Sequence, residues 1–489
     1  MAQVNQAQSN IPGSWSGNKG SNSAYGSYNR FTTIVLPGGT DSGARSQSGV
    51  FGAGEAASRP HRLIPYCRNS RFTGRQSLLQ AVKGFSECEG HNRVALYGLG
   101  GSGKTQIALE YVHQRAAESN CHIFWVQGSG VLKFSEGFKA IAQHVRIPLA
   151  RAKTDETGFL LSVRRWFESP NSGSWILIVD NADNEADFIG NNSPIAKFIP
   201  QGTSGTLIFT TRSRLVASRQ DCRMIEVGKM EEEEAQELFS KRYCGWGGLK
   251  DREKEAVAAI LSSVHHLPLA VVGSAVFMTE NATSPSIYWT ILQENEGRMK
   301  HLLSRPFCDI HREVETESTL GTYFTTFDQI RQQMPPAADL LRLMAFLNHQ
   351  NIPEELLTQC GLKGMDHSAD FRCAIGKLLG LSLVTSAECQ DKTFYQLDRL
   401  VQLSLQAYLQ TNELNHGRAA ALKAISRVFP QSRDGRQYID PVYIPHALAA
   451  TKDSTDPVAE ELGFRVALYL LDMGSYDNAD IQFRGCTAL

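Results

Sequence analysis

The chain has 489 residues, of which 42% are hydrophobic, and its 49 Lys and Arg nearly balance its 50 Asp and Glu. This length predicts about three or four domains, and the near-neutral charge excludes a global field that attracts nucleic acid or an anionic membrane. No apolar run approaches the roughly 20 residues that span a bilayer, and no secretory signal is recognisable at the start. The 10 cysteines lack C-x-x-C spacing, which favours reduced thiols in a cytoplasmic protein over a disulfide framework or a zinc site.

Residues 1–60 are rich in Gly, Ser, Asn and Gln and poor in aliphatic residues. Such a segment cannot bury enough apolar surface to offset the entropy of ordering it, so the composition predicts a disordered arm. An alternative is a short assembly-prone motif, because the stretch Ser21–Val35 mixes polar residues with Tyr25, Tyr28 and Phe31, a composition that can form cross-β stacks.

A glycine-rich loop lies between an apolar run typical of a strand, Val94–Tyr97, and a run typical of a helix, Gln106–Val112. Residues 98–105 read GLGGSGKT, the G-x-x-x-x-G-K-[ST] spacing of a phosphate-binding P-loop. Glycines let successive N–H groups point inward and form an anion site at a helix N-terminus. A chance glycine-rich turn would not combine this spacing with both flanking elements. The predicted ligand-binding residues of this loop are Gly98, Gly100, Gly101, Ser102, Gly103, Lys104, Thr105 and Gln106.

Three further apolar runs alternate with segments typical of helices: His122–Val126, Ser174–Asp180 and Gly205–Arg212. Alternating strands and helices predict an α/β fold with a doubly wound parallel sheet and the ligand over the strand C-termini. We expect the strand that ends in Asp180 to lie beside the P-loop strand, where Asp180 and Thr105 would hold Mg²⁺.

The residues after Asp180 suggest slow catalysis. Asn181 stands where a fast ATPase would have a second carboxylate, and an amide can position a water but cannot accept its proton. Asp183 is the candidate replacement. Arg212, at the tip of the next strand, is a candidate ligand of a γ-phosphate, with a surface salt bridge as the alternative. The predicted catalytic set is therefore Asp180, Asp183 and Arg212, with slow turnover if any.

The composition divides the rest of the chain into predicted modules. After a nucleotide-binding domain at residues 61–229, a helical module covers residues 230–305 and is interrupted at Leu267–Ala270. Residues 320–412 combine helices with two short strands, 382–386 and 393–397, which suits a winged helix. Residues 440–489 begin tetratricopeptide-like repeats. Because one repeat cannot bury its own apolar face, we expect that the repeat region is truncated or that this unit caps another surface.

Taken in order, these motifs resemble the NB-ARC branch of the STAND signalling NTPases, the switch module of NOD-like receptors. The set comprises Phe72-Thr73-Gly74-Arg75, the P-loop, Ser174–Asp180, Gly205–Arg212, Leu267–Ala270 and Tyr395–Gln402. The form of Arg399–Gln402 and the repeat-like end look most like fungal NB-ARC–tetratricopeptide proteins. The resemblance implies ATP or ADP with Mg²⁺ as ligands. It places Phe72, Thr73, Gly74 and Arg75 on the adenine side and Pro268 near the base and ribose.

Two residues depart from the family pattern. His266 stands where the family has glycine, and Asp398 stands where the winged helix of the family offers a histidine to the β-phosphate of ADP. The resemblance therefore places Asp398 at the diphosphate. A carboxylate there repels phosphate unless it is protonated or paired, for instance with Arg399.

The resemblance implies a switch in which nucleotide exchange drives opening and self-association through the nucleotide-binding module. It also implies protein partners at the repeats, a cytoplasmic location, and a role in fungal-type innate immunity or non-self recognition. A stand-alone P-loop ATPase is the alternative. A winged-helix transcription regulator is disfavoured because Val401–Leu405 and the helices before it show no Lys/Arg stripe.

Overall fold

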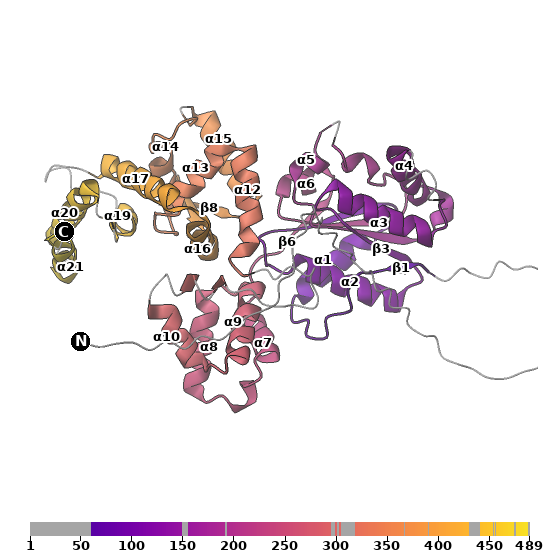
Figure 1. Cartoon of the computed structure of the whole chain (residues 1–489), viewed down its shortest axis with the longest axis horizontal. Coiled ribbons are helices and arrows are strands. Elements are labelled where there is room, and N and C mark those ends of the chain that lie inside the picture. Colours follow the sequence, from indigo (N-terminus) through magenta and orange to yellow (C-terminus); the bar gives the residue numbers. More distant parts are fainter. Residues whose placement is uncertain are drawn as a thin grey trace, which may run out of the picture. The chain divides into compact units, whose positions relative to one another are not determined.

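The computed structural model describes most of the chain after the predicted N-terminal arm (Figure 1). The described residues are 60–148, 155–190, 193–294, 299–300, 303–304, 318–365, 367–389, 391–429, 441–452, 454, 456–473 and 476–487. The predicted arm, residues 1–60, lies outside them except for Pro60.

A six-stranded, all-parallel sheet forms the nucleotide-binding part, with strand order β1-β3-β4-β5-β2-β6. Its strands are β1 (Arg62–Leu63), β2 (Asn92–Tyr97), β3 (His122–Gln127), β4 (Trp175–Asp180), β5 (Thr206–Thr211) and β6 (Arg223–Glu226). The central strands are buried along almost their whole length, because helices cover both faces of a parallel sheet. The predicted α/β fold is therefore confirmed.

Helices cover the two faces of this sheet in two groups. One core contains side chains of α1 (Gln76–Ser86) and α2 (Lys104–Glu118). The opposite core contains side chains of α3 (Val131–His144), α4 (Glu156–Phe167) and α6 (Arg214–Arg219). The short α5 (Glu185–Phe188) and the single 3₁₀ turns Pro170–Ser172 and Ala196–Phe198 complete this part.

The strand order corrects one expectation from the sequence. β4, which ends in Asp180, does not lie beside the P-loop strand β2, because β5 is inserted between them and pairs with both. The apolar runs of β3, β4 and β5 are interchangeable by composition, so their lateral order depends on how the helices cross the sheet. β1 and β6, which the sequence did not predict, have only 2 and 4 residues.

A group of helices follows the sheet. It consists of α7 (Glu232–Arg242), the 3₁₀ turn Trp246–Gly248, α8 (Asp251–Ser263), α9 (Pro268–Glu280) and α10 (Pro285–Glu294). The predicted interruption at Leu267–Ala270 is the start of α9. Pro268 occupies the first turn, where its missing N–H would have no helical partner in any case.

Residues 318–409 combine helices with a three-stranded antiparallel sheet of order β7-β9-β8. The elements are a 3₁₀ turn (Gly321–Tyr323), α12 (Phe324–Gln333), α13 (Pro335–Met344), β7 (Ile352–Pro353), α14 (Glu354–Thr358), α15 (Ser368–Gly380), β8 (Val384–Cys389), β9 (Lys392–Leu397) and α16 (Arg399–Tyr408). The two expected strands are β8 and β9, and β7 joins them. The winged-helix interpretation stays a prediction.

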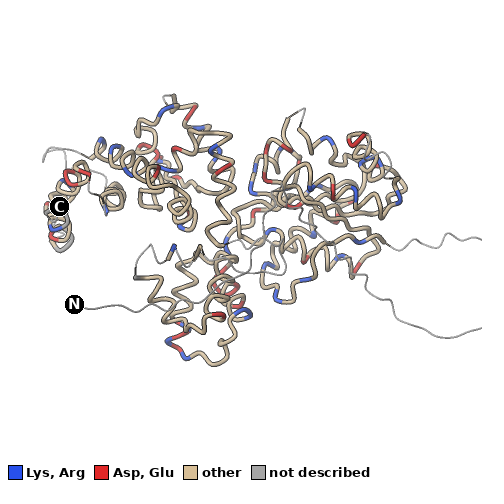
Figure 2. The backbone as a smooth tube through the Cα atoms, viewed as in Figure 1, with Lys and Arg blue, Asp and Glu red and all other residues tan. Residues whose placement is uncertain are grey.

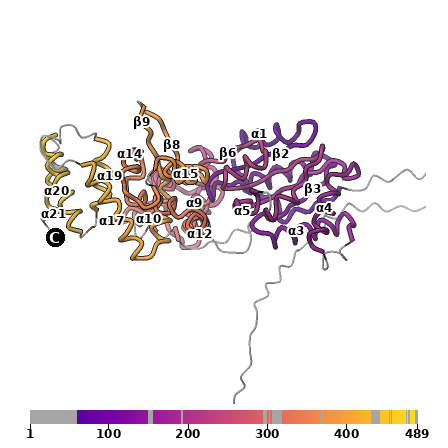
Figure 3. Tube along the Cα trace, turned by 90° about the horizontal axis from the view of Figure 1, so that it is seen from above, coloured from indigo at the N-terminus to yellow at the C-terminus, as the bar shows by residue number. Residues whose placement is uncertain are grey.

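The last described helices are α17 (Thr411–Val428), α19 (Tyr443–Thr451), α20 (Pro457–Asp472) and α21 (Tyr476–Thr487), each packed on its neighbour (Figure 3). The tetratricopeptide assignment stays a prediction. Acidic and basic residues are interspersed along the backbone of the described elements (Figure 2). Among the described helices, none is long and apolar enough to cross a membrane.

His446 of α19 is a fully buried histidine that packs on the loop before β7. Its Nε2 lies 3.1 Å from the Asn351 carbonyl oxygen and donates to it. Burial lowers the pKa of the imidazole to about 4, and hydrogen bonds to the backbone of Asn351 and Asn348 oppose this shift only in part. The native state therefore keeps His446 neutral where an unfolded histidine is already charged.

We expect acidification from pH 7 to pH 5 to lower the free energy of unfolding by about 2 kcal/mol through His446. This contribution is present above pH 6.5, the ordinary pKa, and is lost as pH falls toward about 4. Urea unfolding of the wild type and of His446→Gln at both pH values measures it. Other histidines change the free energy of unfolding of both proteins equally. An equal loss of this free energy in the wild type and in His446→Gln would therefore contradict the role of His446.

Candidate functional site

The predicted P-loop connects β2 to α2 and adopts a conformation that requires glycine. Gly98 has φ 144°, and a Cβ there would lie 2.5 Å from the Val227 carbonyl oxygen. Gly103 has φ 94° and is the N-cap residue of α2. The curled loop therefore ends at a helix N-terminus, where backbone N–H groups and the helix dipole attract an anion.

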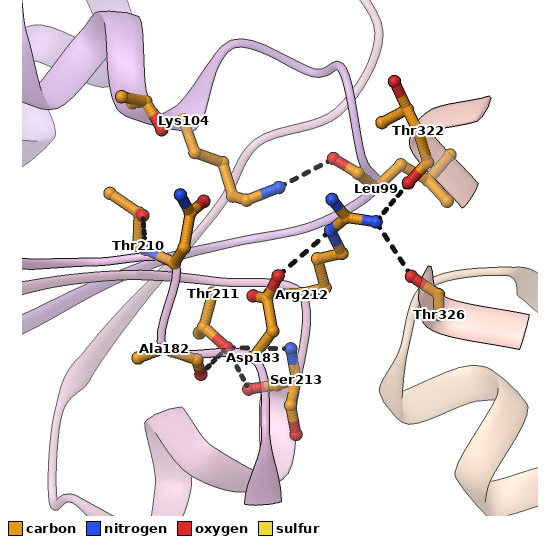
Figure 4. Close-up of polar contacts among 12 residues, drawn as sticks. Leu99, Lys104, Ala182, Asp183, Thr210, Thr211, Arg212, Ser213, Thr322 and Thr326 are labelled. Atoms are coloured by element: carbon orange, nitrogen blue, oxygen red, sulfur yellow. Dashed lines mark hydrogen bonds and ion pairs between the residues drawn. The ribbon is translucent and has the colours of Figure 1, made fainter. Parts of the chain in front are cut away.

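Two polar side chains of the loop are arranged for a phosphate. The Lys104 ammonium is buried and donates to the carbonyl oxygens of Gly98 at 2.8 Å and Leu99 at 2.7 Å, so it lies over the loop (Figure 4). The Ser102 hydroxyl is fully buried and has no hydrogen-bond partner among the described residues. A buried unsatisfied hydroxyl destabilises the fold by about 1–3 kcal/mol, so the loop fits a ligand that offers oxygen atoms.

Asp180 is a fully buried carboxylate at the C-terminal end of β4. Its Oδ1 accepts hydrogen bonds from Thr105 Oγ1 at 2.9 Å and from Thr210 Oγ1 at 2.5 Å. Burial raises the pKa of Asp180, and hydrogen bonds from Thr210, Thr105 and Gln127 oppose the shift. Asp180 and Thr105 of α2 thus meet although β4 is not a neighbour of the P-loop strand β2, and their oxygen atoms are the ligand type that Mg²⁺ prefers.

Sequence reasoning missed Thr210 and Gln127, which hold this carboxylate. Gln127 ends β3 and is in register with Asp180. Its Oε1 accepts a hydrogen bond from Asn181 Nδ2 at 3.4 Å. Thr210 also accepts a hydrogen bond from the Asn181 backbone N–H, at 2.9 Å. The sequence does show a polar residue at or near the end of each of these apolar strands. Contact between such a residue and Asp180 could not be predicted, because it requires knowing that β3 and β5 flank β4.

Arg212 and Asp183 form a pair at the same edge of the sheet. Arg212 Nε lies 3.1 Å from Asp183 Oδ2, and the Arg212 backbone N–H donates to Asp183 Oδ1 at 2.7 Å (Figure 4). The two side chains are only 17% and 18% exposed. This partly buried pair differs from a solvated surface salt bridge, which was the alternative for Arg212.

The guanidinium of Arg212 also reaches residues beyond the nucleotide-binding part. Its Nη1 donates to the Thr322 carbonyl oxygen at 2.5 Å and to Thr326 Oγ1 at 2.8 Å (Figure 4). Gly100 of the P-loop lies directly beside this contact, since a Cβ there would be 2.8 Å from Thr322 Cγ2 and 3.2 Å from Arg212 Nη1. One cation therefore joins the P-loop edge to the start of α12.

Beside the P-loop is a pocket whose empty space, including the part open to solvent, is about 600 Å³. Its predicted lining residues are Phe72, Thr73, Arg75, Gly101, Ser102, Gly103, Gln106 and Pro268. The lining residues that sequence reasoning missed are Asn69, Arg71, Ile107, Met230, Leu238, Arg242, Leu269 and Val272. Several of these belong to α7 and α9. From the sequence alone, an apolar residue in these helices is indistinguishable from a residue of the hydrophobic core. Gly74 lies behind the cavity, against the Glu234 side chain.

Arg75 ties the P-loop to the chain that enters α7. Its guanidinium donates to the carbonyl oxygens of Gly228 at 2.7 Å, Lys229 at 2.9 Å and Ser102 at 3.4 Å. Its backbone N–H donates to Glu234 Oε1 at 2.5 Å. Burial lowers the pKa of Arg75, and Glu234 opposes the shift. The side chain lines the cavity and also fixes the backbone of one of its walls.

Asp398 is not among the residues that line the cavity. Its Oδ1 accepts hydrogen bonds from the backbone N–H groups of Leu400 at 2.8 Å and Val401 at 3.3 Å, so it is the N-cap of α16. Its Oδ2 lies 3.4 Å from His265 Nδ1. Arg399, considered above as the partner of Asp398, donates a hydrogen bond to Gln402 Oε1.

We expect Arg75→Ala to lower the free energy of unfolding by about 3 kcal/mol, because it leaves buried carbonyl oxygens without their charged donor. Chemical denaturation measures this loss. Arg71→Ala, which removes an exposed arginine from the same loop, is the matched control and should change stability by less than about 0.5 kcal/mol. Equal effects of both substitutions would refute the structural role of Arg75.

Comparison with known families gives two matches. The NB-ARC domain matches residues 75–244, and a domain of unknown function (DUF7779) matches residues 328–414. A nucleotide-binding leucine-rich repeat (NLR)-like protein of the fungus Hyaloscypha variabilis is 29% identical over 420 residues. These cover 80% of this chain and 41% of that protein, so the chain spans less than half the length of this relative.

Two solved structures show more distant similarity. The ORC2 protein of Aeropyrum pernix, in ADPNP–ADP complexes, is 13% identical with a TM-score of 0.42 and covers 71% of this chain and 96% of its own. A STAND protein with a tetratricopeptide repeat sensor from Pyrococcus horikoshii is 14% identical with a TM-score of 0.27. The match covers 86% of this chain and 59% of that protein. The matched segment contains the P-loop, Asp180 and Arg212, and this chain therefore carries an NB-ARC domain over residues 75–244.

Proposed function

We propose that this chain is an ADP/ATP-dependent signalling switch in which Arg212 reports the state of the bound nucleotide. The observation that carries the proposal is the dual use of one guanidinium. Arg212 pairs with Asp183 beside the P-loop and also donates to Thr322 and Thr326 at the start of α12. Any anion that recruits this guanidinium changes the attachment of α12.

The residues at the P-loop define how a nucleotide would be held. The loop N–H groups and Lys104 would hold the phosphates, and Thr105 with Asp180 would hold Mg²⁺, which neutralises phosphate charge. The cavity lined by Phe72, Thr73 and Pro268 would take adenine and ribose. Arg212 would then exchange the neutral oxygens of Thr322 and Thr326 for an anionic phosphate, which is the stronger acceptor for a guanidinium.

The magnitude of this exchange limits what Arg212 does alone. Changing the ratio of closed to open molecules from 1:99 to 99:1 requires roughly 5.5 kcal/mol of differential binding. Two hydrogen bonds from a charged guanidinium contribute about 1.5–3 kcal/mol each, and the switch gains only the difference between these bonds and the phosphate contact that replaces them. Arg212 therefore supplies part of the required energy, and other contacts between α12–α16 and the sheet must share in the coupling.

The same site supports slow hydrolysis. The residue after Asp180 is Asn181, whose amide meets the amide of Gln127 rather than a proton acceptor. Both carboxylate oxygens of Asp183 are already in contact with Arg212. We therefore propose a conformational role for the nucleotide. Sustained multiple turnover by the isolated protein would support the alternative of a stand-alone ATPase instead.

The biological setting is part of the proposal. The similarity to an NLR-like fungal protein supports a cytoplasmic role in fungal innate immunity or non-self recognition. We propose that opening is followed by self-association through the nucleotide-binding module and that the helices after α17 bind protein partners.

We expect Lys104→Ala to weaken ADP and ATP binding by at least about 100-fold, because the P-loop loses the cation that faces the phosphates. The variant should also lose the stabilisation that ligand gives the wild type, about 4 kcal/mol at 1,000-fold excess over Kd. Calorimetry and thermal unfolding with and without ADP measure both effects. Lys83→Ala, at an exposed lysine, is the control. Full ADP affinity in Lys104→Ala would refute the proposed site.

We expect Asp398→His to slow ADP release by about tenfold, because a phosphate donor replaces a carboxylate that repels phosphate. The substitution also removes the N-cap of α16, which lowers stability by about 1 kcal/mol. Asp398→Asn keeps a capping side chain without the charge and should lie between the two proteins. Stopped-flow fluorescence with an ADP analogue measures the rate of ADP release in the three proteins. An unchanged release rate in Asp398→His would count against a contact between residue 398 and phosphate.

A further inference from the structure

We propose that Lys377 is a latch residue that holds the α12–α16 region closed against the nucleotide edge independently of the nucleotide. Lys377 lies on α15, inside the segment that matches a domain of unknown function. Its ion-pair partner is Glu185, the first residue of α5, which follows the proposed metal-binding Asp180 in the chain. The inference rests on the proposed switch function and assigns this segment a role in it.

The main contact is an ion pair with Glu185. Lys377 Nζ lies 2.6 Å from Glu185 Oε2, and the two side chains are only 10% and 19% exposed. The other carboxylate oxygen of Glu185 accepts a hydrogen bond from Ser213 Oγ at 2.9 Å. Because solvent and salt screen this pair less than an exposed one, it is a stronger candidate for a functional contact than most surface ion pairs.

The same lysine also contacts Gln333, the last residue of α12. Lys377 Nζ donates to Gln333 Oε1 at 3.0 Å, and Gln333 Nε2 donates to Asn184 Oδ1 at 3.2 Å. Residues of α12 and α15 therefore hold Asn184 and Glu185, at the start of α5. These two residues directly follow Asp183, the ion-pair partner of Arg212.

These contacts are separate from the nucleotide contacts. Lys377, Gln333 and Glu185 do not line the cavity, and none of them belongs to the P-loop. Recruitment of Arg212 by a phosphate would therefore leave the Lys377–Glu185 pair intact. This pair favours the closed form whichever nucleotide is bound and so sets a threshold, because exchange of nucleotide alone then opens few molecules.

Charge reversal with rescue tests the latch in the full chain. Lys377→Glu and Glu185→Lys each place like charges at the contact, and we expect each to speed release of a fluorescent ADP analogue by at least about tenfold. The double variant restores opposite charges and should return the rate to within about threefold of the wild type. Lys363→Glu, at an exposed lysine of the same region, has the same change of charge and should leave the rate unchanged.

Hydrogen exchange without nucleotide separates this inference from the proposed function. Backbone exchange in residues 181–190 and 368–380 should be faster in both single variants and return toward the wild-type rate in the double variant. Unchanged exchange, or failure of the double variant to restore it, overturns the latch even where ADP binds normally. Exchange that responds as expected in a chain that binds no ADP supports the latch as a contact and overturns only the switch. Lys377→Gln replaces Lys377→Glu if that variant does not fold, with the same expected direction.

Discussion

The arrangement of the site depends on one cation, the guanidinium of Arg212, placed between two sets of acceptors. On one side it pairs with Asp183 at the C-terminal edge of the parallel sheet, and on the other it donates to the first residues of α12. Gly100 of the P-loop lies against the same contact. A phosphate bound at the loop therefore has a physical route to the α12–α16 region, because it competes for a donor that this region already uses.

Around this cation, the site is built to hold an anion and a metal more than to activate water. Asp180 is fixed by two hydroxyl groups and an amide, and the position after it carries an amide that faces another amide. A proton acceptor is available only if Asp183 leaves Arg212. We propose that such a site would hold nucleotide as a conformational signal, and the contacts of Lys377 with Glu185 and Gln333 would keep the closed form populated.

Much of the site could be predicted because the motifs are local. The P-loop glycines, Lys104 and Thr105 lie within eight consecutive residues, and the strands ending near Asp180 and Arg212 were recognisable as apolar runs. Thr210 and Gln127 were missed because a polar residue near a strand end gains meaning only when its neighbour in the sheet is known. The partner of Asp398 was missed for a similar reason, since His265 is 133 residues away in sequence.

By itself, the sequence determined the four longer strands of the parallel sheet, the phosphate loop and the resemblance to the NB-ARC domain, because each depends on residues close together along the chain. The tertiary structure decided that β5 separates β2 from β4, that Arg212 attaches to Thr322 and Thr326, and that Lys377 reaches Glu185. These contacts join segments whose own sequences are equally compatible with other neighbours. They follow only from the packing of helices on the sheet, which fixes which side chains meet.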